Sequence, residues 1–200
     1  MTVRAAPISA DLILDAAEDC FALAGVRRTT IDDIAAAAGV SRITVYRRTG
    51  SRDDIVLAVL VRITRRYLRS LRPRLLAQPS LADALALLIR STARAARRDD
   101  LSLLFASEER GTTGAPIPGS MPPLADAVGE CIELLTQTWP DQAPAELDPL
   151  DAGEWVLRII VSLATTEPAR PRRERETDDW IRRVALPGLL AAPAPATTAV

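Results

Sequence analysis

Arginine is concentrated in one short stretch of the chain. Residues 41–52, SRITVYRRTGSR, hold four arginines and no acidic residue. A guanidinium group suits bidentate hydrogen bonds to phosphate oxygens, or to O6 and N7 of guanine. The residue types therefore indicate polyanion binding, although a charged run in a protein is more often a solvated surface.

Other chemistries have little support. The chain has no His and no Lys, so His-based acid–base catalysis, Lys Schiff bases and His metal sites are excluded. Glu108 and Glu109 are the acidic pair with the best claim to catalysis, but adjacent helical side chains point about 100° apart. An enzyme is thus a weak alternative, and we expect no catalytic residue, cofactor or metal.

Cysteine usage and hydropathy indicate the cellular compartment in which the protein works. Cys20 and Cys131 are far apart, each in an apolar helical pattern. We expect two buried thiols in a reduced cytosol; a disulfide or redox switch is the alternative. No apolar run approaches a membrane span and no signal-peptide pattern is present, so we expect a cytoplasmic protein without a membrane partner.

The arginine stretch falls within Thr30–Thr49, which the sequence predicts to be two short helices across a tight turn. Thr30 and Asp33 form a capping-box-like pair, Gly39 supplies the turn, and Ser41 caps the second helix. A helix presented in this way fits the major groove of DNA. The alternative is a plain alanine-rich helical hairpin.

Further helices flank this pair. The first spans about Ser9–Ala24, and the fourth starts at Ser51 and is long enough to bridge into a second domain. Pro73 and Pro79 bracket a predicted link. Beyond it, the apolar patterns predict helices at Ser80–Arg98, Asp99–Arg110, Met121–Trp139, Pro149–Thr166 and Thr177–Ala191. Gly111–Ser120 and Glu167–Thr177 are predicted loops, the second of them mobile and charged.

Charge divides the chain in the same place. Residues 1–74 carry 13 Arg against 8 acidic residues, a net +5, and residues 75–200 carry 12 Arg against 18, a net −6. This asymmetry indicates a polyanion-binding module attached to a different one. We predict a DNA-binding domain at 1–72 with its motif at 30–49, a helical domain at 73–192, and a disordered tail at 193–200.

With these residues in place, the chain resembles the tetracycline-repressor (TetR) family of bacterial transcription regulators. The resemblance covers about Ile8 to Leu68. It rests on ILDAAEDCFALAG, then TTIDDIAAAAGVS, then the T-V-Y of Thr44–Tyr46, then the S-R-D-D-I of Ser51–Ile55. Two positions depart from the family: Thr49 stands where an aromatic residue is common, and Arg52 where Lys is common.

The resemblance implies an all-α fold. A three-helix helix-turn-helix domain is joined by a long helix to a helical ligand-binding and dimerisation domain. It implies DNA contacts from Thr30, Ser41, Arg42, Ile43, Thr44, Tyr46, Arg47, Arg48 and Arg52. Thr30, Tyr46 and Arg52 would bond phosphates; Arg42, Thr44 and Arg47 would read base edges; Arg48 suits either. Ile43 either meets a thymine methyl or makes no contact.

The resemblance further implies a homodimer that binds a near-palindromic operator in double-stranded DNA. The apolar faces around Trp155–Leu163 and Trp180–Leu189 suit the dimer interface, although ordinary core is the commoner role of such faces. A small, lipophilic effector would bind between the helices of residues 80–140 and release the DNA of a repressor. Phe105, Glu108, Met121 and Trp139 are possible lining residues. The rival is a helical binding protein that has lost DNA binding.

Overall fold

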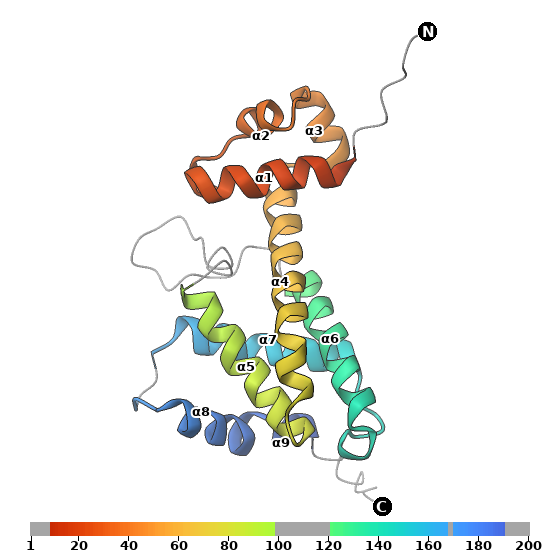
Figure 1. Cartoon of the computed structure of the whole chain (residues 1–200), viewed down its shortest axis with the longest axis vertical. Helices are drawn as coiled ribbons and strands as arrows, with labels where there is room; N and C mark the ends of the chain where they lie inside the picture. Colours follow the sequence, from red (N-terminus) through yellow and green to blue (C-terminus); the bar gives the residue numbers. More distant parts are fainter. Residues whose placement is uncertain (1–8, 99–120, 168–169, 191–200) are drawn as a thin grey trace, which may run out of the picture. The chain divides into compact units, whose positions relative to one another are not determined.

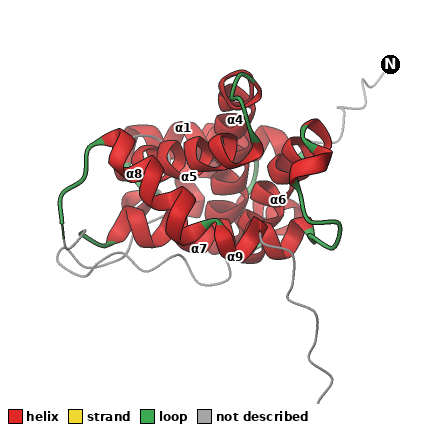
Figure 2. Ribbon diagram, turned by 90° about the horizontal axis from the view of Figure 1, so that it is seen from below, coloured by secondary structure: helices red, strands yellow, loops and turns green. Residues whose placement is uncertain are grey.

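The computed structural model describes residues 9–98, 121–167 and 170–190. These residues form helices and loops and contain no strand (Figure 2). The all-α prediction is therefore confirmed for the described residues. The chain divides into two compact units within one long helix, between Ile63 and Thr64. The predicted domain boundary at residue 72 remains a proposal.

The first unit is built from α1 (Ala10–Ala24), a 3-10 turn (Val26–Arg28), α2 (Ile31–Ala37), α3 (Arg42–Thr49) and the start of α4 (Arg52–Leu76) (Figure 1). Helices α1, α2 and α3 contact one another pairwise. Their shared core is fully buried and includes Ile13 of α1, Ile34 of α2 and Val45 of α3. The 3.6-residue spacing of these apolar side chains is what places them on inward faces.

The second unit comprises the rest of α4, α5 (Leu81–Arg98), α6 (Met121–Thr138), a 3-10 turn (Pro140–Gln142), α7 (Pro149–Thr165), α8 (Glu174–Trp180), a π-helical segment (Ile181–Ala185) and α9 (Pro187–Leu190). Its centre is α5, which contacts α6, α7 and α8. The helix predicted at Ser80–Arg98 is confirmed, and the apolar residues behind that prediction are fully buried: Leu81, Leu85, Leu88 and Ile89.

Helices α6 and α7 approach so closely that glycine is required between them. A Cβ added to Gly153 would lie 2.3 Å from the carbonyl oxygen of Ala125 and 2.8 Å from the backbone nitrogen of Gly129. Both glycines are buried. The two backbones therefore touch where both helices lack a side chain.

Three local predictions are wrong. The expected link does not begin at Pro73, because α4 continues through this proline to Leu76. Pro73 is exposed, whereas Leu71 and Leu75 on the opposite side are buried. The unpaired carbonyl that a proline leaves in a helix can thus be hydrated, while core packing holds the helix together.

The other two corrections concern the carboxy-terminal region. The predicted loop at 167–177 ends earlier, because Glu174–Thr177 belong to α8: the Arg173 amide donates to Glu176 (2.8 Å), and Glu174 pairs with Arg94 (2.6 Å). The predicted helix 177–191 is not one regular α-helix, because the amide of Leu186 bonds the carbonyl of Ile181 across a π turn (3.0 Å). The predicted helix 99–110, loop 111–120 and tail 193–200 lie outside the described residues.

Candidate nucleic-acid interface

The amino terminus of α2 is fixed by a reciprocal cap. The Asp33 carboxylate accepts from the amide (2.8 Å) and the hydroxyl (2.7 Å) of Thr30, and the Asp33 amide donates to the Thr30 hydroxyl oxygen (3.2 Å). These bonds lower the pKa of Asp33 below its ordinary value. The predicted capping box is confirmed. The exposed Thr30 hydroxyl already donates its proton to Asp33.

The turn between α2 and α3 depends on Gly39, whose φ is +66°. In this left-handed conformation the amide of Val40 reaches the carbonyl of Ala35 (2.9 Å) and closes the end of α2. Ser41 then caps α3 by accepting from the amide of Thr44 (3.2 Å). The predicted helix–turn–helix is thus confirmed in its caps and its turn.

Helix α3 is anchored by one buried residue and exposes most of the rest. Val45 is fully buried, whereas Ile43 is 77% exposed and Tyr46 is 46% exposed. Ile43 has no core role that would explain an aliphatic side chain there. Exposed aliphatic and aromatic groups beside guanidinium groups suit contact with bases and sugars.

Arg47 and Arg48 project from the end of α3 into solvent. Within the described part of the chain, neither makes an ion pair. A cationic pair without local carboxylates keeps its full attraction for phosphate. This is the feature that most favours nucleic-acid binding.

Arg42 is held in place by two neighbours. Its guanidinium lies 3.3 Å from the Asp32 carboxylate and 5.8 Å from the centre of the Tyr46 ring. Tyr46 and Asp32 together raise the pKa of Arg42 above its ordinary value. Asp32, whose exposed carboxylate makes this contact, is not among the site residues predicted from the sequence. Its partner lies ten residues away across the turn, and no sequence pattern reports that contact.

Ser41 and Thr44 form a small hydroxyl pair at the start of α3, with their oxygens 2.9 Å apart. Ser41 is exposed and Thr44 is half-buried. Thr44, which the resemblance implies as a base-edge contact, is therefore less exposed than Ser41. Each hydroxyl keeps hydrogen-bonding capacity for an incoming group.

Arg52 differs most from its predicted surroundings. Its guanidinium donates hydrogen bonds to the carbonyl of Val26 and to the carbonyl of Thr29. The bond to Thr29 is 3.0 Å long. The Thr29 hydroxyl in turn donates to the carbonyl of Gly25 (2.9 Å). Arg52 thus ties the start of α4 to the segment that leads into α2, and two of its donor groups serve the fold. Its predicted phosphate contact remains a prediction.

The remaining chemistry is sparse. Cys20 and Cys131 are free and half-buried, and burial raises the pKa of Cys131 to about 11. The described residues contain no cluster of His, Cys, Asp or Glu that would hold a metal. No described helix is long and apolar enough to cross a membrane. Phe105 and Glu108, predicted to line a pocket, lie outside the described residues.

Comparison with known proteins agrees with the motif geometry. Residues 13–59 match the family model described as bacterial regulatory proteins, tetR family. An uncharacterized HTH-type transcriptional regulator of Mycobacterium tuberculosis strain H37Rv is 28% identical over 163 residues, which cover 82% of this chain and 78% of the relative.

Two solved structures share the fold. RolR in complex with resorcinol has a TM-score of 0.67 at 17% identity, over 92% of this chain and 88% of its own. The repressor FadR of Thermus thermophilus in complex with lauroyl-CoA has a TM-score of 0.57 at 22% identity. The match covers 95% of this chain and 100% of the FadR chain. The family match covers α1, α2, α3 and the start of α4, and the likeness in fold extends through the second unit. Residues 13–59 thus carry the amino-terminal module of the tetR family of bacterial regulatory proteins, within a chain whose fold resembles solved proteins of the same kind.

Proposed function

We propose that this chain is a ligand-responsive repressor that binds a near-palindromic DNA operator as a homodimer. The observation that carries the proposal is helix α3, which is anchored by buried Val45 and presents Arg47 and Arg48 without ion-pair partners among the described residues. Two such helices in a dimer would enter successive major grooves, about 34–36 Å apart. A protein that binds an operator works in the cytoplasm.

Roles follow from chemistry and exposure. Arg42 and Arg47 suit the O6 and N7 of guanine, and Ile43 suits a thymine methyl. Tyr46 and Arg48 suit phosphate oxygens, which set register without reading sequence. Thr30 would have to release the Asp33 carboxylate before its hydroxyl could donate to a phosphate. Ser41 and Thr44 offer hydroxyls at the start of α3. Arg52 has a guanidinium only partly open to solvent, so we assign it a smaller share of the phosphate contact.

The dimer interface is proposed on the exposed apolar side chains of α7 and the π segment. Trp155 is 42% exposed and Val184 is 59% exposed. The Trp155 indole donates to the carbonyl of Ala185 (3.1 Å), so both elements contribute to one surface. A partly exposed indole whose N–H is bound within the fold is a typical anchor of a protein interface.

The test is fluorescence anisotropy with labelled DNA from upstream of the chain's own gene, against a scrambled duplex, at two salt concentrations. The proposal expects selective binding that weakens as salt rises, because phosphate contacts release counterions. If fragments selected from the whole genome also bind no better than the scrambled duplex, the chain is instead a helical binding protein without operator recognition. The tetR family comprises regulators, and an enzymatic role has no support here.

A further inference from the structure

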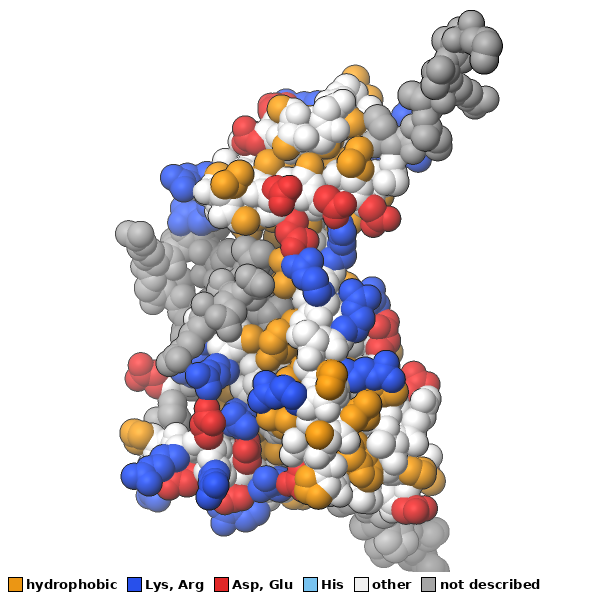
Figure 3. All heavy atoms as spheres, viewed as in Figure 1, with side chains coloured by type: hydrophobic (Ala, Val, Ile, Leu, Met, Phe, Trp, Pro, Cys, Tyr) orange, Lys and Arg blue, Asp and Glu red, His pale blue; other side chains and the backbone are white. Residues whose placement is uncertain are grey.

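The second unit contains a surface cavity of about 640 Å³ between α5, the end of α7 and α8. Four arginines line it, against two carboxylates: Arg90, Arg94, Arg97 and Arg172, with Glu167 and Glu174. Figure 3 shows charged side chains of both signs gathered over α5 and α8. The lining therefore carries a net positive charge, whereas residues 75–200 as a whole carry a net −6.

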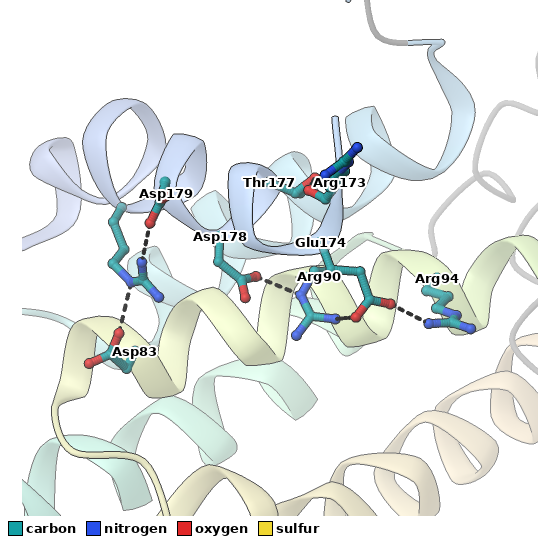
Figure 4. A network of polar contacts seen from close by, with 9 residues as sticks. Asp83, Arg90, Arg94, Arg173, Glu174, Thr177, Asp178 and Asp179 are labelled. Carbon is teal, nitrogen blue, oxygen red and sulfur yellow. Dashed lines mark hydrogen bonds and ion pairs between the residues drawn. The ribbon is translucent and has the colours of Figure 1, made fainter. Parts of the chain in front are cut away.

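Two of these arginines hold the cavity walls together. Arg90 donates to Asp178 of α8 (2.6 Å), as Figure 4 shows. Arg97 donates to the carbonyls of Leu163 (3.0 Å) and Thr166 (3.1 Å) at the end of α7, where a cation also meets the negative end of the helix dipole. These bonds fix α7 and α8 against α5.

The other two arginines keep free donors. Among the described residues, Arg94 makes one hydrogen bond, from Nη1 to Glu174 (2.6 Å), and its side chain is 59% exposed. Arg172 stacks on the ring of Trp180 at 5.2 Å and has no acidic partner among the described residues. Cationic groups with unused donors thus border the cavity on two sides, from α5 and from the segment before α8.

The rest of the lining combines three apolar side chains with the hydroxyls of Ser162, Thr166 and Thr177. Ala93 is buried, and Leu163 and Trp180 are half-buried at the same cavity. A neutral lipophile seated on these apolar side chains would cover the guanidinium groups of Arg94 and Arg172 without satisfying their donors, which costs free energy. A ligand with an acidic group would satisfy them.

We infer that this cavity binds an amphipathic organic anion, whose carboxylate or phosphate lies between Arg94 and Arg172 and whose apolar part lies on Leu163 and Trp180. The inference rests on the proposed function and assigns the class of its effector. The bound anion competes with Glu174 for Arg94, and Glu174 is in the first turn of α8. Ligand and α8 are thereby coupled through one guanidinium group.

The test uses the purified full-length chain and three probes of equal chain length: decanoate, decyl phosphate and neutral 1-decanol, each titrated by calorimetry. We expect both anions to bind at least about tenfold more tightly than the alcohol, because a charge-assisted hydrogen bond contributes that much. Arg94→Gln and Arg172→Gln should each weaken anion binding by about tenfold.

Arg158→Gln is the matched control, because Arg158 pairs within α7 with Glu154 (2.5 Å) and does not line the cavity. It should leave anion binding unchanged. Binding that is equal for decanoate and decanol, absent for both anions, or unaltered by both cavity substitutions would overturn the inference. Anion binding that depends on Arg94 and Arg172, in a protein that binds no DNA, would uphold the site and overturn the proposed function.

Discussion

At the scale of single residues, Arg47 offers the cleanest test of base reading. It is exposed, forms no ion pair among the described residues, and follows the buried anchor Val45 by two positions. Arg47→Ala should reduce operator affinity by about 1–3 kcal/mol and flatten the preference at one base position. Anisotropy on operator duplexes with single base changes measures both effects. A uniform loss on every sequence would reassign Arg47 to a phosphate.

Substitutions of Arg52 test whether this side chain stabilises the fold or contacts DNA. Arg52→Met keeps the length of the side chain but leaves the carbonyls of Val26 and Thr29 without their charged donor. We expect the free energy of unfolding to fall by about 1–3 kcal/mol in urea titrations, with Arg52→Lys intermediate. DNA affinity that falls at unchanged stability would show that Arg52 serves the phosphate alone.

At the scale of elements, the contact between α6 and α7 leaves no room for an added side chain at Gly153. Gly153→Ala places a methyl group 2.3 Å from the Ala125 carbonyl oxygen, so the helices must separate. We expect a loss of about 1–3 kcal/mol in stability, measured as a lower Tm. Gly188→Ala is the matched control, because its Cβ would meet only Trp155, at 4.0 Å. Equal Tm values for the two variants would contradict the close approach.

The caps of α2 and α4 make a prediction about pH. Hydrogen bonds from Thr30 and Ser51 lower the pKa values of Asp33 and Asp54 below 3.8. A carboxylate whose pKa is lower in the folded state stabilises above its unfolded pKa, and this contribution is lost as pH falls through the folded pKa.

Thermal unfolding should therefore show a constant cost of Asp33→Asn and Asp54→Asn from pH 7 down to the approach to the unfolded pKa of 3.8, and a shrinking cost as the pH falls further through the folded pKa values. The amide side chain that either substitution introduces does not titrate in this range. Only the parent protein therefore loses these hydrogen bonds as the pH falls. A cost that stays constant over the whole pH range would contradict the role of these carboxylates.

Local sequence signals predicted the elements of the first unit well. Gly39, Ser41 and the Thr30–Asp33 pair act within a few residues of one another, so their geometry is encoded locally. Predictions from the sequence were wrong where packing between residues far apart in the chain determines the local structure. Pro73 is tolerated because the helix around it is held by buried leucines, and Glu174 is helical because Arg90 and Arg94 of α5 bind it.

The same limit applies to the candidate site. The residue types of α3 were available from the sequence, and the 3.6-residue period accounts for the exposed face opposite the buried Val45. The contacts of Arg42 with Asp32, and of Arg52 with the carbonyl of Val26, join residues 10 and 26 positions apart. Periodicity carries no information about such pairs, so the inward role of Arg52 was not foreseen.

At the scale of the whole molecule, dimerisation is the first prediction. Trp155→Arg places a charge in the proposed interface and should yield a monomer by light scattering, because an unpaired charge at the centre of an interface is costly to desolvate. Leu23→Arg is a suitable control, since Leu23 is 86% exposed on α1. A stable dimer carrying Trp155→Arg would refute the placement of the interface.

The central claim is sequence-selective DNA binding by α3. Its most direct measurement is the anisotropy of labelled genomic fragments, selected on the purified protein, titrated with the parent chain and with Arg47→Ala over a series of salt concentrations. We expect tight binding by the parent chain, with log K falling linearly with log salt, and loss of selectivity in the variant. Fragments that bind no better than random DNA, or selectivity that survives in Arg47→Ala and Arg42→Ala alike, would contradict it.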